Sequence, residues 1–191
     1  AAVFGSLKLR THMKQLFLAV LLTCCAFYCS FSQGGKPFFT ATYEGGMITH
    51  PGAGVSAGTE LFAHGKIHLD VGVKAAFYSH KNYRTAVYLL PFMNLWLKNG
   101  DKLWYGFNYD FGIQRTFIPH SYTVNESGGA ERLRFAGTTS RLSGVGILLS
   151  GRTKYDGYRW IINPQLLQNP SGISKKEKYF VLGMGIIKSI Q

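Results

Sequence analysis

The chain has 191 residues, of which 46% are hydrophobic and 15% aromatic, while only 16% are charged, against about 25% in ordinary soluble domains. The net charge is +12, but the positive residues are largely scattered along the chain, which argues against a nucleic-acid-binding protein. No run reaches about 18 uninterrupted apolar residues, so no membrane-spanning helix is predicted in the mature chain.

Residues 1–32 are predicted to be a leader and signal peptide. A positively charged start precedes an apolar run over 16–28, and small residues then flank a cleavage site between Ser32 and Gln33. The mature chain is left without a disulfide or a cysteine metal site, because all three cysteines lie in this segment: Cys24, Cys25 and Cys29. Residues 33–191 are then predicted to form one domain.

Eight stretches of that domain alternate apolar with small or polar side chains, and this period of two predicts β-strands. In chain order they lie around 39–50, 55–61, 67–80, 87–98, 103–114, 143–150, 158–166 and 180–186. The stretch LWYGFNYDFGIQ, at 103–114, shows the alternation most plainly. No helix is predicted after the signal peptide, so the fold class is all-β.

The two rows of side chains reverse the pattern of a soluble barrel, in which the apolar row faces the core and the polar row faces water. One row is apolar and often aromatic, and we expect it to face lipid, with Leu103, Tyr105, Phe107, Tyr109, Phe111, Phe180, Leu182 and Met184 as its members. The other row predicts an interior polar network of Glu44, Glu60, Asp70, Lys74, Asn108, Asp110 and Arg159. This arrangement predicts an eight-stranded antiparallel up-and-down transmembrane β-barrel. A soluble lipocalin-like barrel or sandwich, with the rows reversed, is the alternative, and the low charge disfavours it.

The predicted connections alternate in length. Short turns at 64–66, 98–102 and 152–157 alternate with loops that include 79–85, 116–140 and 169–178. Outer-membrane barrels have short periplasmic turns and longer external loops, so we expect the short turns on the periplasmic side. Pro91 and Pro164 interrupt two strands, and each predicts a bulge or a local break, because proline cannot donate to the ladder.

The remaining candidate residues are aromatic residues near strand ends, two histidines at a turn and an adjacent His-Ser pair. Aromatic residues near strand ends predict girdles at the lipid head groups: Trp96, Trp104, Tyr105, Tyr158 and Trp160. His64 and His68 flank one turn but lack an obvious third ligand, so no metal site is predicted. His120 and Ser121 are adjacent, and a strand would point them to opposite faces, so no catalytic pair is predicted. No cofactor is expected.

Several segments of the chain resemble segments of a known protein family. They are the signal ending FSQ, the first hairpin at 43–62 (YEGGMITHPGAGVSAGTELF), the segment at 87–112, and the closing GYRWIINPQLL and YFVLGMGIIK. With them the chain resembles the small eight-stranded outer-membrane β-barrels common in Bacteroidota. The resemblance implies residence in the outer membrane of a Gram-negative bacterium and brings no catalytic residues with it.

The sequence therefore favours a non-enzymatic structural or interaction subunit with a filled polar interior. Its expected partners are outer-membrane lipid and lipopolysaccharide, with other outer-membrane proteins as further partners, and no nucleic acid. Two alternatives stay open: a membrane-embedded lipid-modifying enzyme, such as a lipid A deacylase, and a small channel.

Overall fold

The computed structural model describes residues 35–45, 51–80, 84–100, 102–117, 122–124, 129–132, 137–169 and 177–190. The predicted signal peptide with its cleavage site lies outside these residues, as do His120 and Ser121, so what was inferred about them stays a prediction. Within the described part of the chain, no helix is long and apolar enough to cross a membrane.

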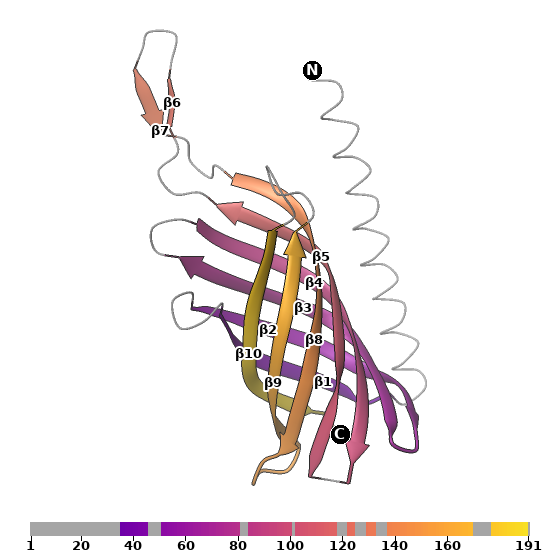
Figure 1. The fold of residues 1–191 in the computed structure, drawn as a ribbon. Helices are drawn as coiled ribbons and strands as arrows, with labels where there is room; N and C mark the ends of the chain where they lie inside the picture. The colour runs from indigo at the N-terminus through magenta and orange to yellow at the C-terminus, as the bar shows by residue number, and fades with distance from the viewer. Residues whose placement is uncertain are drawn as a thin grey trace.

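Eight strands of the described residues close into an antiparallel barrel (Figure 1). They are β1 (Pro37–Gly45), β2 (Gly52–His64), β3 (Ile67–His80), β4 (Arg84–Asn99), β5 (Leu103–Phe117), β8 (Gly137–Arg152), β9 (Tyr158–Asn169) and β10 (Glu177–Ser189). Each pairs with its neighbour along the chain, and β1 pairs with β10 to complete the ring. The predicted all-β, eight-stranded, antiparallel up-and-down barrel is therefore confirmed.

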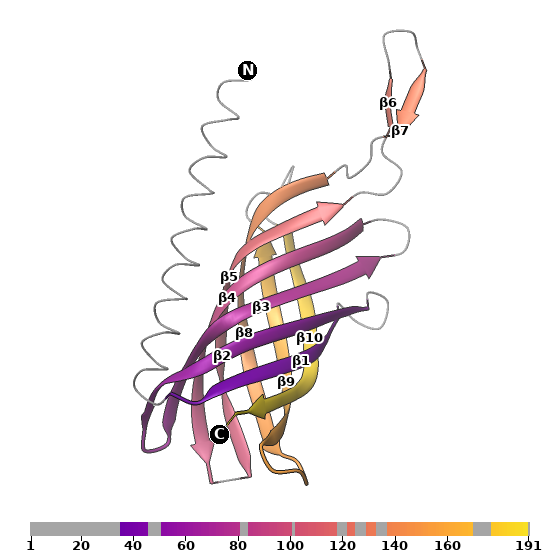
Figure 2. The ribbon, with the colours of Figure 1, turned by 180° about the vertical axis from the view of Figure 1, so that it is seen from behind.

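Two further strands, β6 (Tyr122–Val124) and β7 (Ala130–Arg132), form a separate two-stranded ribbon. The ribbon lies between β5 and β8 in the chain, inside the predicted long loop. Both views show it beyond the end of the barrel (Figures 1 and 2). The sequence pattern did not predict it, because strands of three residues are too short to show a period of two.

The three predicted short turns are present, and each contains a glycine with a left-handed backbone. The φ angles are 58° at Gly65, 67° at Gly100 and 78° at Gly157, a region that glycine enters without a steric penalty. Both ribbon views place these turns at one end of the barrel, together with the end of β10 (Figures 1 and 2). We call this the turn end and the opposite one the loop end.

The two prolines lie at local breaks in the ladder, as predicted. The β4–β5 pairing skips Leu90 and Pro91, and the β8–β9 pairing skips Asn163 and Pro164, with the same register on both sides of each gap. The register shifts elsewhere, at a bulge around Leu61 between β2 and β3. The prolines thus cost hydrogen bonds without changing which face a side chain occupies.

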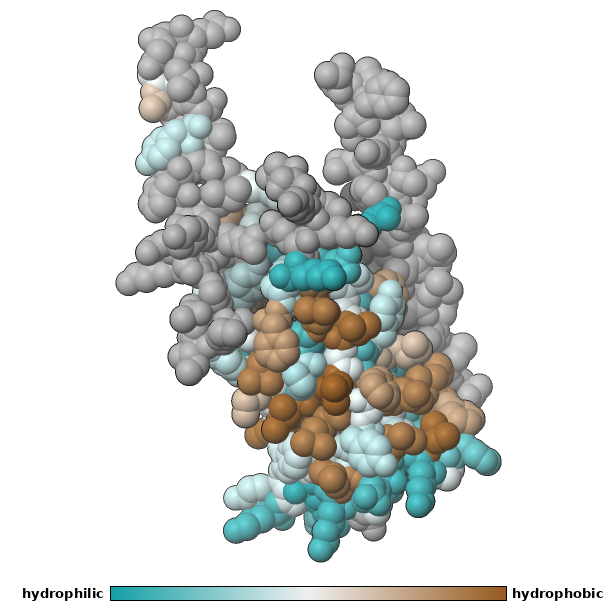
Figure 3. Space-filling model, in the orientation of Figure 1, coloured by the Kyte–Doolittle hydropathy of each residue, from teal (hydrophilic) through white to brown (hydrophobic). Residues whose placement is uncertain are grey.

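The outer surface of the barrel is apolar along every strand. Large side chains stand exposed on it, with 62% of Val55, 63% of Phe107 and 58% of Ile147 accessible. The face drawn in Figure 3 shows an apolar band edged by hydrophilic residues at the turn end. Polar side chains are buried instead, with Asp110 at 0% and Gln165 at 1%. In water, such a barrel would expose an unfavourably large apolar area. In a membrane, an apolar outer surface is what the lipid requires.

The interior is not wholly polar, which corrects the prediction of a filled polar lumen. Two buried apolar clusters occupy it. The turn-end cluster consists of Phe38, Phe92, Trp96, Leu148, Ile161 and Ile187, with Trp104 packed against it. The loop-end cluster consists of Ala76, Tyr88, Leu90, Leu142, Leu167 and Val181, with Tyr78 and Tyr179 packed against it. An eight-stranded barrel is just narrow enough for such side chains to fill.

The girdle prediction was wrong for two tryptophans. Trp96 is 2% exposed and belongs to the turn-end cluster inside the barrel, and Trp104 packs against the same cluster. Tyr105 is exposed on the outer surface, and Trp160 and Tyr158 are half-buried. Proximity to a strand end does not determine whether a side chain faces lipid or the lumen. That is determined by whether the position is odd or even along the strand.

Glycines on the inner wall make room for the large side chains. A Cβ at Gly58 would overlap the ring of Phe38 on the neighbouring strand. We expect Gly58→Ala to lower the free energy of unfolding by about 1–3 kcal/mol through overpacking, measured by urea titration in lipid vesicles. Gly129→Ala is the control, since no atom of the described residues lies within 4 Å of a Cβ there. Equal stability of the two variants would contradict the packing.

Candidate functional site in the barrel interior

Lys74 on β3 lies between two carboxyl groups in the middle of the barrel. Its Nζ is 2.9 Å from Oδ2 of Asp110 on β5 and 3.4 Å from Oε1 of Glu44 on β1. It also donates a hydrogen bond of 3.0 Å to Oε1 of Gln165 on β9. All four residues are buried, with Lys74 at 7% and Glu44 at 3% exposure. We call these four residues the central cluster.

Both carboxyl groups receive further hydrogen bonds. The hydroxyl of Tyr88 donates to Oε2 of Glu44 at 2.8 Å. Asp110 accepts from Nε2 of Gln165 and from Nδ2 of Asn108, each at 2.8 Å. Gln165 Nε2 also contacts Oδ1 of Asn108. A buried ionic group is tolerated only when paired and hydrogen-bonded in this way, so the cluster is a structural element of the lumen.

The remaining predicted polar residues form a second group nearer the turn end. Oε2 of Glu60 lies 2.6 Å from Nδ1 of His68. Asp70 accepts a hydrogen bond of 2.7 Å from Nε1 of Trp96. The guanidinium of Arg159 lies 3.5 Å from the centre of the Trp104 ring.

The seven residues predicted as one interior network are thus split between two levels. The central level holds Glu44, Lys74, Asn108 and Asp110, and the turn-end level holds Glu60, Asp70 and Arg159. His64 and His68 are not brought together, because His64 is exposed and stacks on Phe62.

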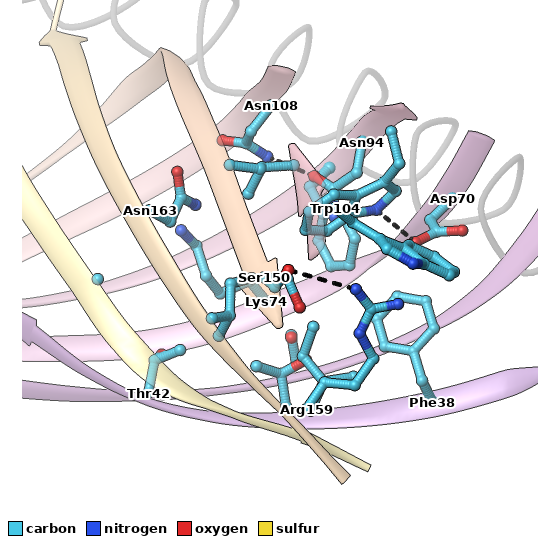
Figure 4. A pocket seen from close by; sticks show the side chains of 18 of the residues that line it. Phe38, Thr42, Asp70, Lys74, Asn94, Trp104, Asn108, Ser150, Arg159 and Asn163 are labelled. Carbon is cyan, nitrogen blue, oxygen red and sulfur yellow. Dashed lines mark hydrogen bonds between the residues drawn. The ribbon is translucent and has the colours of Figure 1, made fainter. Parts of the chain in front are cut away.

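A cavity of about 130 Å³ connects these two levels (Figure 4). Lys36 and Ser189 lie at its turn-end margin, and Lys74 and Asp110 at its inner end. Beyond the central cluster, the loop-end apolar cluster fills the lumen, with Leu90 and Leu167 each at 0% exposure. The cavity therefore leads inward from the turn end and stops within the barrel.

Sequence reasoning missed three residues of this interior: Tyr88, Trp96 and Trp104. The alternation did place Ser150 and Gln165 on the polar row, but they were not singled out as members of the network. A signal was available on β4, whose sequence VYLLPFMNLW is apolar on both rows. When one row of a membrane barrel faces lipid, a second apolar row can only fill the lumen.

The residues predicted to face lipid stand on the outer surface. Seven are exposed and Leu182 is half-buried: Leu103, Tyr105, Phe107, Tyr109, Phe111, Phe180, Leu182 and Met184. In the described part of the chain, no group of three or more histidine, cysteine, aspartate or glutamate side chains could hold a metal ion.

Comparisons with known proteins were made on sequence and on structure. No protein-family model matches the chain, and a search of curated proteins finds no relative. Among solved structures, Neisserial surface protein A superposes with a TM-score of 0.50 at 10% identity, over 82% of this chain and 96% of that one. The chain has the outer-membrane β-barrel fold.

Two further matches are weaker. The outer-membrane protein Ail of Yersinia pestis has a TM-score of 0.45 at 10% identity, covering 82% of this chain and 99% of its own. A designed transmembrane β-barrel has a TM-score of 0.44 at 12% identity, covering 82% of this chain and 96% of its own. At 10% identity, the likeness to Neisserial surface protein A describes the fold alone. The resemblance to the Bacteroidota barrels stays a prediction.

Proposed function

We propose that the protein resides in the outer membrane of a Gram-negative bacterium as a non-enzymatic structural or interaction subunit. The supporting observation is the filled lumen. The central cluster occupies the middle of the described barrel, and the loop-end apolar cluster occupies the lumen beyond it. What remains for function is the outer surface: the apolar belt, which contacts lipid and lipopolysaccharide, and the two ends of the barrel.

The loop end offers a surface for partners. β5 and β8 continue as a pair to Phe117 and Gly137, and the β6–β7 ribbon follows from them. Arg115 lies on this extension, donating to Oγ1 of Thr139 at 3.0 Å, and Arg141 is exposed nearby. Cations at this level suit the phosphate groups of lipopolysaccharide, and the ribbon suits another outer-membrane protein.

Purification from native outer membranes after mild crosslinking tests the subunit proposal. We expect a discrete set of co-purifying outer-membrane proteins, lost when residues 122–132 are replaced by a short Gly-Ser linker. The replaced protein should still show heat-modifiable gel mobility, which establishes that its barrel is folded. Recovery of the intact protein alone, without partners, would remove the subunit role.

A lipid-modifying enzyme is the alternative of another class. Its candidate residues, His120 and Ser121, belong to the long loop and lie outside the described residues. The lipid A and phospholipid profiles of a strain lacking the protein distinguish a lipid-modifying enzyme from a non-enzymatic subunit. An altered profile that Ser121→Ala fails to restore supports the enzyme, and an unchanged profile removes it.

The small-channel alternative has its own measurement. Because Leu90, Leu142 and Leu167 lie buried across the lumen, we expect planar-bilayer recordings of the purified barrel to show no conductance steps of fixed size. Reproducible unit steps would overturn the filled-lumen interpretation and favour the channel.

A further inference from the structure

Four buried polar atoms on the wall of the turn-end cavity have no hydrogen-bond partner among the described residues. They are Oγ of Ser150, Nε1 of Trp104, Nε of Arg159 and Oδ1 of Asn163. Ser150 is wholly buried, at 0% exposure. Native interiors rarely leave such groups unpaired, so water or a polar ligand must occupy this cavity and meet these four atoms.

Three of these atoms are hydrogen-bond donors or can act as such. Figure 4 shows Arg159, Trp104 and Ser150 around the same cavity. The guanidinium of Arg159 uses its face to stack 3.5 Å from the Trp104 ring. Its edge makes one long bond, 3.5 Å from Nη2 to the backbone oxygen of Ser150. A guanidinium edge beside an indole N–H and a hydroxyl is a donor set suited to an oxyanion.

Lysine side chains gather at the turn-end mouth of the cavity, where an anion would enter. Lys36 lines the cavity at its margin, and Nζ of Lys98 lies 5.3 Å from the centre of the Trp104 ring. Lys66 and Lys102 are exposed in the adjoining turns. Cations around a narrow mouth raise the local concentration of anions.

Four carboxyl groups line the cavity and oppose an anion: Glu44, Glu60, Asp70 and Asp110. Glu44 and Asp110 are paired with Lys74. The other two lie nearer the turn end. Glu60 is engaged by His68, and Asp70 accepts from Trp96, so both already have partners. Neither forms an ion pair with Arg159 within 4.0 Å in the described structure, which leaves the edge of the guanidinium available. Repulsion from Asp70 weakens an anion site without abolishing it. Removing the charge of Asp70 should therefore strengthen anion binding, the opposite of the effect of removing Arg159.

We propose that the turn-end cavity binds a small oxyanion, a phosphate or carboxylate group, through Arg159, Trp104 and Ser150. The volume of about 130 Å³ admits a small ion with a few waters and is too small for a nucleotide or a lipid. This site is independent of whether the protein acts as a subunit at its loop end.

The test is a titration of the refolded barrel, in phospholipid-free detergent, with inorganic phosphate and separately with acetate at constant ionic strength. Tryptophan fluorescence is the readout, because Trp104 stacks on Arg159. We expect a saturable change. Arg159→Gln should weaken binding by about tenfold or more, because it removes a charge-assisted donor, and Arg159→Lys should restore part of it.

Two further variants make the result specific. Ser150→Ala removes one unpartnered oxygen and should weaken binding by a smaller factor, whereas Asp70→Asn should tighten it by removing repulsion. Arg115→Gln, a loss of one cation at the loop end, is the matched control and should bind like the parent. A change that is linear in anion concentration, or equal in Arg159→Gln and Arg115→Gln, would overturn the site.

Discussion

Replacing Lys74 with methionine is expected to lower the free energy of unfolding of the barrel by about 3–5 kcal/mol. The substitution keeps the volume of the side chain but leaves Glu44 and Asp110 facing each other in the lumen without their cation. Both carboxyl groups are buried, at 3% and 0% exposure, and the few waters that the narrow turn-end cavity admits compensate two carboxylates less well than an ammonium group does. Urea titration in lipid vesicles, followed by gel mobility, measures the loss.

Two comparison variants separate the missing charge from other effects. Lys102→Met removes an exposed cation in a turn and should change stability by no more than about 0.5 kcal/mol. The triple variant Glu44→Gln, Lys74→Met, Asp110→Asn removes all three charges and should recover most of the loss. If Lys74→Met is as stable as Lys102→Met, the central cluster does not carry the stability assigned to it.

Arginine in the middle of the apolar belt is expected to lower the stability of the barrel, by an amount that depends on how deep in the membrane the position lies. Phe107→Arg should destabilise the inserted barrel by about 2–4 kcal/mol, whereas Leu103→Arg should cost about 0–1 kcal/mol. The two positions share one strand and one face, but Leu103 begins β5 beside a turn and Phe107 lies a further four residues along it. At Leu103 the long side chain can reach the aqueous interface.

This pair also distinguishes the membrane barrel from a soluble one. In water, arginine at an outer position that is 63% exposed, as Phe107 is, would be neutral or would improve solubility. Folding yield into vesicles and the urea midpoint of both variants give the comparison. Equal costs at the two depths, or a soluble and stable Phe107→Arg monomer without detergent, would argue against insertion of this face into lipid.

The barrel was predictable because its two environments impose a period of two on every strand. In β5 the odd positions from Leu103 to Ile113 face lipid and the even ones face the lumen, so the sequence alone assigns each side chain to a face. The same alternation explains why the two misassigned tryptophans face the lumen. Trp96 shares its row with Asn94 and Trp104 shares its row with Asn108, and both asparagines face inward.

The levels inside the lumen were not predictable in the same way. Which inner residues meet depends on strand tilt and register, and these are set by the closed ring rather than by any one strand. Glu44 near the end of β1 meets Lys74 in β3 through that stagger, and Asp70, only two positions along the same inner row of β3, belongs to the other level. The β6–β7 ribbon was missed for a local reason, its short strands.

The hydrogen bond from Lys74 to Gln165 links positions 91 apart in the sequence. It crosses the lumen from β3 to β9, so it cannot form until the late strands of the chain have arrived. A partly assembled sheet of β1 to β5 would keep Glu44, Lys74 and Asp110 on a wall open to water, while its other face was already suited to lipid. Ring closure and dehydration of these charges are therefore a single event, and such long-range contacts form slowly. We expect the final strand pairing of β1 with β10 to be the step that commits the protein to its membrane-embedded state, with the open intermediate still hydrated along its inner wall.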